Sequence, residues 1–141
     1  MIGTQRNRPG LRVPEAATYG GAMRHQVTDD DTAIALGSGD VPVLGTPRLI
    51  AWLEAATVDA AAVYVDPGQT TVGTVVRVRH LRATPIGDSV ECVAIPRVRK
   101  EGRVLAFSVQ ATDETGEVVA EGEIERAVVD RERFLDGVTP E

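Results

Sequence analysis

One long helical pattern, followed only by strand patterns, constrains the fold of this chain more than any other feature. The pattern spans residues 46–64, where apolar side chains recur at helical spacing on one side. We expect Thr46 to be the N-cap and Pro47 the first helical residue, because proline has no N–H group to leave unpaired there. A turn signal at 66–68 is expected to end the helix. The predicted buried stripe consists of Leu49, Ile50, Leu53, Thr57, Ala60 and Tyr64.

Four segments after the helix alternate between apolar and polar residues, as strands do. They span 71–82, 89–99, 104–112 and 117–129. We also expect a strand at 22–28, a short strand at 32–36 and a short helical end at 131–135. One helix followed by four strands with short turns is an α+β plan. Its economical form is a curved antiparallel sheet wrapped around one long helix, whose apolar side lies in the concave face.

The 141 residues fit one domain, which we place at 20–135, between a loose leader at 1–19 and a tail at 136–141. The net charge of −6 argues against binding to nucleic acid or to an anionic membrane. Because no apolar stretch is long enough for a signal peptide or a membrane span, a cytoplasmic location is expected. With Cys92 as the one cysteine and only two histidines, we expect no intrachain disulfide and no metal site.

Three polar side chains lie where the pattern predicts burial or a helix end. Glu54 is at the edge of the buried stripe, so it is either functional, paired with a strand arginine, or bent out to solvent. His80 shares a predicted strand face with apolar residues, where it could titrate near neutral pH or be a hydrogen-bonded core residue. Thr46 is a plain N-cap or a hydroxyl acting beside the positive end of the helix. The predicted face of His80 also carries Val72, Thr74, Val76 and Val78.

Weaker signals lie next to these three residues. Gly73-Thr74 could let a ligand approach the backbone closely, although Gly73 could equally mark a bulge or bend. Arg48 and Leu49 are expected to keep free N–H groups in the first helical turn, where an anion or a developing oxyanion could bind.

Two stretches, VLGTPRLIAWLEAATVDAA and TVGTVVRVRHLRATPIGD, resemble the hot-dog thioesterases related to fluoroacetyl-CoA thioesterase. That family has a threonine at the helix entrance, a glutamate eight residues later and a histidine 26 residues after the glutamate, in a G-T-x-x-x-V-x-H-like segment. Thr46, Glu54 and His80 hold these places, with Gly73-Thr74 upstream of the histidine. The tail GRVLAFSVQATDETGEVVAEGEIERAVVD looks like the last two strands of the family, and the resemblance covers 20–134.

The resemblance implies a hot-dog fold, a homodimer or higher oligomer, and hydrolysis of an acyl-CoA or related thioester without a cofactor. Glu54 would be the general base or nucleophile, assisted by Thr46 and His80. From their positions beside these three residues, we expect Gly73, Thr74 and Arg48 to contact the substrate. The pocket would form where two subunits meet. Because the loop DVPVLGT carries no aromatic residue that could shape a lid, fluoroacetyl specificity is not carried over, and we expect a broader or different acyl preference.

Two alternatives stay open. A hot-dog dehydratase or hydratase would act on the same class of thioester, although its motifs are not found in this sequence. A non-catalytic acyl-CoA-binding module would bind without turnover. Release of free thiol from a panel of acyl-CoAs distinguishes the three.

Overall fold

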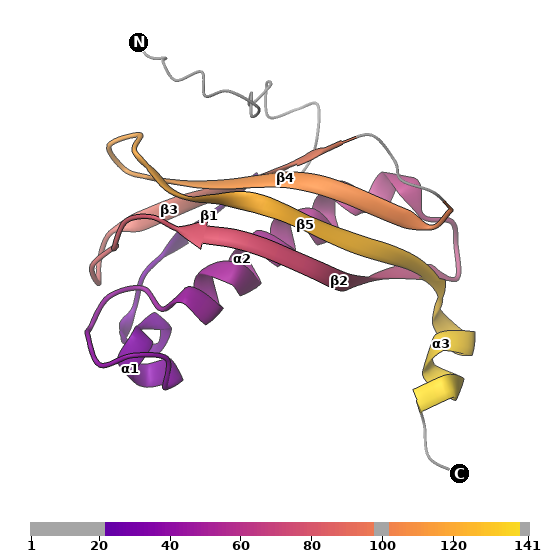
Figure 1. Ribbon diagram of the computed structural model, residues 1–141, viewed down its shortest axis with the longest axis horizontal. Coiled ribbons are helices and arrows are strands. Elements are labelled where there is room, and N and C mark those ends of the chain that lie inside the picture. The colour runs from indigo at the N-terminus through magenta and orange to yellow at the C-terminus, as the bar shows by residue number, and fades with distance from the viewer. Residues whose placement is uncertain (1–21, 98–101, 139–141) are drawn as a thin grey trace.

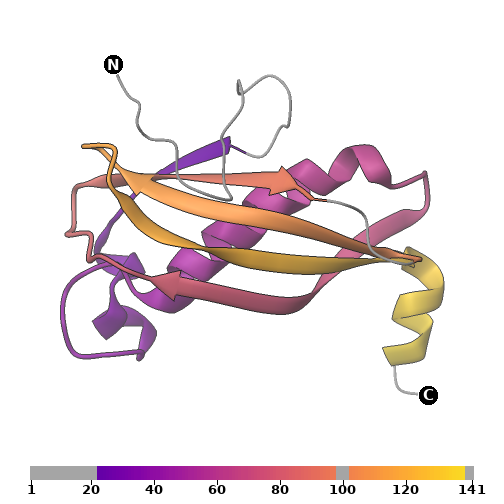
Figure 2. The same ribbon diagram turned by 45° about the horizontal axis from the view of Figure 1, so that its top comes forward.

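A five-stranded antiparallel sheet and one long helix form the two layers of the molecule (Figure 1). The computed structural model describes residues 22–97 and 102–138. The strands are β1 (Ala22–Gln26), β2 (Gln69–His80), β3 (Ser89–Pro96), β4 (Val104–Asp113) and β5 (Val118–Asp130). Their order across the sheet is β1-β3-β4-β5-β2, and each neighbouring pair is antiparallel. The sheet curves around helix α2 (Thr46–Ala61), as Figure 2 shows, so the predicted α+β arrangement is confirmed.

The long helix lies where the sequence predicts it, but it starts differently. α2 continues into a 3-10 turn, η4 (Ala62–Tyr64), so the two together span the predicted 46–64. The N-cap is Gly45, not Thr46, which is the first helical residue. A side chain at Gly45 would lie about 3.1 Å from the backbone of Ala33, which explains why a glycine occupies this cap. The N–H groups of Arg48 and Leu49 donate to the carbonyl of Gly45, so the prediction that both stay free is wrong.

The segment before α2 is helical where a short strand was expected. Residues 32–36 form α1 (Ala33–Leu36), preceded by the 3-10 turn η3 (Asp29–Asp31). The hydroxyl of Thr32 caps this helix by accepting from the N–H of Ala35, at 3.1 Å. Gly37 ends it with a left-handed φ of 71°, which glycine adopts without strain. At the other end of the chain, the predicted helical end is α3 (Arg131–Val138). The predicted leader at 1–19 lies outside the described residues.

Strand β2 contains a bulge that divides its predicted single face. The pairing with β5 shifts between Gly73 and Val75, which makes Thr74 the extra residue. After the bulge, His80 lies opposite the buried Ala120 and faces the helix, as do Val76 and Val78. Before the bulge, the alternation is reversed, so Val72 lies on the opposite face. The prediction of one continuous face from Val72 to His80 is therefore wrong at its beginning.

The core lies between α2 and the concave face of the sheet. The helix buries six side chains there: Leu49, Leu53, Ala56, Thr57, Ala60 and Ala61. From the sheet, Phe107, Val109 and Ile124 are fully buried against them. Two residues of the predicted stripe lie outside the core, since Ile50 is half-buried and Tyr64 is 41% exposed.

Burial raises the pKa of Cys92 to about 12, so this thiol is an apolar core residue. No helix in the described ranges is long and apolar enough to cross a membrane.

Candidate active site

Thr46 and His80 form a hydrogen-bonded pair where the start of α2 meets the end of β2. The Thr46 hydroxyl oxygen lies 2.8 Å from Nδ1 of His80. Because Thr46 does not cap its own helix, the hydroxyl is available for this contact. Burial lowers the pKa of His80 below its usual value, and a backbone hydrogen bond with Arg82 acts in the opposite direction. The imidazole is therefore neutral at pH 7.

The second ring nitrogen of His80, Nε2, is the one that indicates a site for a water molecule or a ligand. Nε2 is buried and has no hydrogen-bond partner among the described residues. A buried polar atom without a partner costs about 1–3 kcal/mol. Such an atom calls for a water molecule or a ligand, so the imidazole has one side fixed by Thr46 and the other side available.

The Glu54 carboxylate packs against Gly73 and faces the buried Arg126. A Cβ atom at position 73 would lie 2.5 Å from Oε2 of Glu54, so only glycine leaves room for the carboxylate in this position. Nη1 of Arg126 lies 3.7 Å from the same oxygen. The Glu54 side chain is 38% exposed and that of Arg126 is 8% exposed. The carboxylate therefore has one side against protein and one side open.

Arg126 is held in place by threonines from two other elements. Its Nε donates to the hydroxyl of Thr71 at 2.8 Å, and Nη2 donates to the Thr71 carbonyl at 3.1 Å. Nη1 donates to the hydroxyl of Thr57 at 3.5 Å, and that hydroxyl donates to the Glu54 carbonyl at 2.6 Å. Burial lowers the pKa of Arg126, while Glu54 opposes this shift. With its guanidinium fixed in this way, Arg126 is a counter-ion that sets the position of the Glu54 carboxylate.

Sequence reasoning missed Arg126, although a signal was present. Ile124 is on the helix-facing side of β5, and period-2 alternation puts Arg126 on that same side. A strand arginine as the partner of Glu54 was one of the alternatives left open. An arginine on a predicted apolar face could therefore have been matched with the unexplained glutamate.

The Glu54 carboxylate and the Thr46–His80 pair do not meet within one chain. Glu54 is eight residues after Thr46, which is roughly 12 Å along a helix. On β2, Gly73 and His80 are roughly 20 Å apart. Among the described residues, no hydrogen bond or ion pair joins Glu54 to Thr46 or His80. One chain thus holds two separate clusters of the candidate active site, which we call the hydroxyl–imidazole half-site (Thr46, His80) and the carboxylate half-site (Glu54, Gly73, Arg126).

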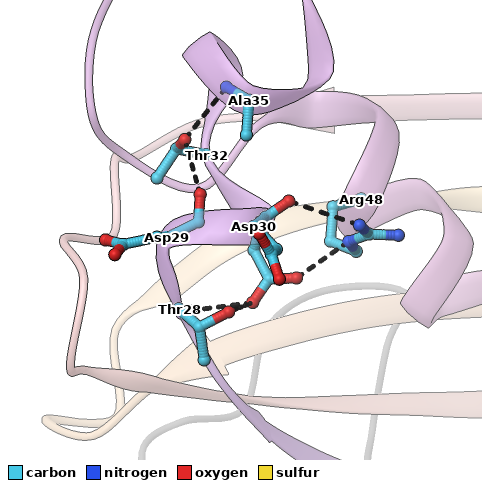
Figure 3. Close-up of polar contacts among 7 residues, drawn as sticks. Thr28, Asp29, Asp30, Thr32, Ala35 and Arg48 are labelled. Carbon is cyan, nitrogen blue, oxygen red and sulfur yellow. Dashed lines mark hydrogen bonds and ion pairs between the residues drawn. The ribbon is translucent and has the colours of Figure 1, made fainter.

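Arg48 and Thr74, both predicted to contact substrate, make contacts within the protein. Nε of Arg48 donates to Oδ1 of Asp31 at 2.8 Å, and Nη2 donates to the carbonyl of Asp30 at 3.3 Å. Figure 3 shows Arg48 beside Asp30 at the start of α2. Burial alone would raise the pKa of Asp31, but hydrogen bonds from Thr28 and Arg48 outweigh it and lower the pKa. The Thr74 hydroxyl donates to the carbonyl of Glu125 at 3.2 Å. Arg48 therefore ties the start of α2 to the preceding segment.

A cavity of about 360 Å³ opens beside the hydroxyl–imidazole half-site. It is lined by Thr46 and by residues from 38–45 and 80–83. Its volume suits a small ligand or part of a larger one. No phenylalanine, tyrosine or tryptophan is among its lining residues. Within 22–97 and 102–138, no three histidine, cysteine, aspartate or glutamate residues gather as a metal site would require.

Comparison with known proteins gives related enzymes. A family model described as "FlK: Fluoroacetyl-CoA-specific thioesterase" matches residues 27–132. A curated protein from Streptantibioticus cattleyicolor named fluoroacetyl-CoA thioesterase is 39% identical over 92 residues. That alignment covers 65% of this chain and 65% of the relative, which is slightly less than two thirds of its length.

Solved structures agree with this family. A mutant of the fluoroacetyl-CoA-specific thioesterase FlK, in complex with fluoroacetate and CoA, superposes with a TM-score of 0.76 and 32% identity, over 84% of this chain and 98% of that chain. A thioesterase superfamily member from Thermus thermophilus shares the fold, with a TM-score of 0.75 at 22% identity over 82% of this chain and 84% of that one. The fold is therefore the predicted hot-dog fold, and the chain belongs to the FlK family of hot-dog thioesterases.

Proposed function

We propose that this protein hydrolyses an acyl-CoA thioester to a free acid and a thiol. The observation that carries the proposal is the Glu54 carboxylate, seated on Gly73 and positioned by the buried Arg126 on a helix that is otherwise apolar on that side. The name of the family and the FlK complex with fluoroacetate and CoA support acyl-CoA as the substrate class. The acyl group itself is left open, since no phenylalanine, tyrosine or tryptophan lines the cavity.

The active site is proposed to form between two copies of the chain. β2 lies at the edge of the described sheet beyond β5, and Val76 is 40% exposed although it faces the helix side. An exposed edge strand of this length invites pairing with another strand. Antiparallel pairing of β2 with β2 of a second copy would place the His80 end of one strand beside the Gly73 end of the other. Glu54 would then face Thr46 and His80 of the partner subunit.

In this site the catalytic groups have distinct roles. Glu54 accepts a proton from a water molecule, whose oxygen forms a bond to the carbonyl carbon of the thioester. The C–S bond then breaks and the CoA thiolate leaves and takes up a proton, so that water and thioester give an acid and a thiol. In the tautomer in which Nδ1 accepts from the Thr46 hydroxyl, the neutral imidazole of His80 carries its proton on Nε2. That N–H donates to the carbonyl oxygen or the leaving sulfur.

Glu54 could instead attack the carbonyl carbon itself, which would give a mixed anhydride that water then hydrolyses. A single turnover in ¹⁸O-labelled water tests for the anhydride route. Water that attacks the glutamyl carbonyl of the anhydride leaves label in the Glu54 side chain, whereas the water route leaves the enzyme unlabelled, so label in Glu54 establishes the anhydride.

The test of the proposed function is thiol release from acetyl-, fluoroacetyl- and longer acyl-CoAs. The proposal expects release that Glu54→Gln abolishes. Hydration of an unsaturated acyl-CoA without thiol release would instead assign the protein as a hydratase. Binding without any turnover would make it an acyl-CoA-binding module.

A further inference from the structure

Helix α3 carries an apolar face that stays exposed among residues 22–97 and 102–138. None of its residues is buried: Phe134 is 40% exposed, Leu135 is 49% exposed and Val138 is 64% exposed. At 100° per residue these three lie within one arc of about 100°, which also holds Arg131 in the first turn, while the charged Glu132, Arg133 and Asp136 lie on the other side. A helix with separate apolar and charged faces usually packs its apolar face against something.

The start of α3 is fixed, so its direction is set by the fold. The N–H of Arg131 donates to the carbonyl of Gly68 at 2.9 Å, which ties the helix to the turn before β2. Oδ1 of Asp130 accepts from the N–H of Arg133 at 2.9 Å and caps the first turn. In Figures 1 and 2, α3 leaves the end of β5 and projects past β2, away from the other four strands. This is the edge at which a second copy is proposed to pair.

At the opposite end of β2, α1 and the start of α2 project past the same edge in both views. A twofold axis that pairs the two β2 strands would exchange these ends. Each α3 would then lie against the loop and cavity of the other subunit, and both contacts would form at once, as a twofold interface requires. The eight residues of α3 span about 12 Å, which is enough to cross two neighbouring strands about 4.8 Å apart.

We infer that α3 of each copy covers the cavity of the other copy, with Phe134 as the aromatic side chain of the acyl pocket. The inference deepens the proposed function and rests on it. The rim of the cavity presents apolar side chains to such a helix, since Val41 is 49% exposed and Leu81 is 44% exposed. No phenylalanine, tyrosine or tryptophan lines the cavity, and α3 supplies a phenylalanine from the partner subunit. Phe134 thereby limits the length of the acyl group that fits.

Cross-linking tests the position of α3 independently of catalysis. Val41→Cys and Val138→Cys, combined in one chain, place thiols on two exposed positions, while Cys92 is fully buried. A short bismaleimide should join Val41→Cys of one chain to Val138→Cys of the other, giving a covalent product of twice the 15.0 kDa chain mass. Each single variant should give no such product. The pair Val41→Cys with Val63→Cys is the matched control, because Val63 is 83% exposed on η4.

The outcomes separate the position of α3 from the activity. A covalent dimer in the first pair but not in the control supports the inference, even if no acyl-CoA is hydrolysed and the proposed function fails. If light scattering gives a dimer but cross-linking gives only intrachain product, or no product, the inference is wrong. If light scattering gives a monomer, both the inference and the proposed shared active site are wrong. In the active enzyme, Phe134→Ala should shift the kcat/KM ratio of long to short acyl-CoAs about tenfold towards the long ones, and Val63→Ala should leave it unchanged.

Discussion

Glu54 and His80 both lie beside apolar surfaces, but each has a different neighbour. Glu54 faces the guanidinium of Arg126, which three hydrogen bonds hold in place. His80 has the uncharged hydroxyl of Thr46 on one nitrogen and no described partner on the other. A carboxylate beside a fixed counter-ion can accept a proton, and an imidazole that burial keeps neutral can donate one from its N–H group. This difference is the physical basis for assigning them separate roles.

Glu54→Gln should retain the fold and lose thioesterase activity by at least about 100-fold, as expected when a general base or nucleophile is removed. The amide has nearly the shape of the carboxylate but cannot take a proton from water. The measurement is thiol release under saturating substrate, with thermal unfolding as a check on the fold. Asp59→Asn is the matched control, because Asp59 is exposed on the same helix. Activity of Glu54→Gln within a fewfold of the parent would make Glu54 a structural residue.

The two half-buried histidines predict how stability depends on pH. Burial lowers the pKa of His80 and of His25, whose ring stacks on Trp52 with centroids 4.4 Å apart. In the unfolded chain both titrate near 6.5. Below that pH the unfolded chain binds protons that the folded chain does not, so the free energy of unfolding falls as pH drops from about 7 to about 5. Above it both states are neutral and the two histidines have no effect.

Urea unfolding at about pH 7.5 and about pH 5.5 measures this effect. His80→Gln should show a smaller loss of stability between the two pH values than the parent, and so should His25→Gln. Most carboxylates in the unfolded chain titrate below this window, so they contribute little to the difference. An unchanged pH slope in both variants would show that neither ring is desolvated in solution.

At the scale of elements, local patterns predicted most of the fold and long-range contacts account for the rest. The helix at 46–64 and the four later strands follow from periodicity, which neighbouring residues determine. The N-cap is Gly45 and not the predicted Thr46, whose hydroxyl bonds to His80 across the fold. The bulge at Thr74 depends on pairing with β5, distant in the sequence. Arg126 was missed for the same reason, since its partners come from α2 and β2.

The contact between Arg48 and Asp31 connects the segment before α2 to the helix start that carries Thr46. Arg48→Met should lower the free energy of unfolding by about 1 kcal/mol, a modest value because the Arg48 side chain is 34% exposed. It should also reduce kcat, because Thr46 is less firmly held beside His80, and leave KM for acyl-CoA nearly unchanged. Urea unfolding and steady-state kinetics give the two values, with the exposed Arg24→Met on β1 as the control. A raised KM with unchanged stability would instead show that Arg48 binds substrate, as its place in the first helical turn predicted.

At the scale of the whole molecule, the separation of the two half-sites within one chain is the property that argues for a dimer. If each chain had to bring Glu54 to its own His80, a shift of roughly 12–20 Å within a packed sheet and helix would be required. Close-packed cores do not deform on that scale. A twofold dimer joins the half-sites without moving either one, and it also covers the edge of β2. Light scattering should therefore give a mass near twice 15.0 kDa at micromolar concentration.

Mixing two inactive variants tests whether the site is shared. In a heterodimer of Glu54→Gln and His80→Ala, one of the two sites combines both mutated residues and the other combines both native ones. After subunit exchange half of the dimers are mixed, so the mixture should recover about a quarter of the parent activity. The variants Thr46→Ala and His80→Ala are the matched control, because both alter the hydroxyl–imidazole half-site and their heterodimer contains no intact site. If mixing Glu54→Gln with His80→Ala restores nothing while mass spectrometry shows that mixed dimers have formed, each site lies within a single chain.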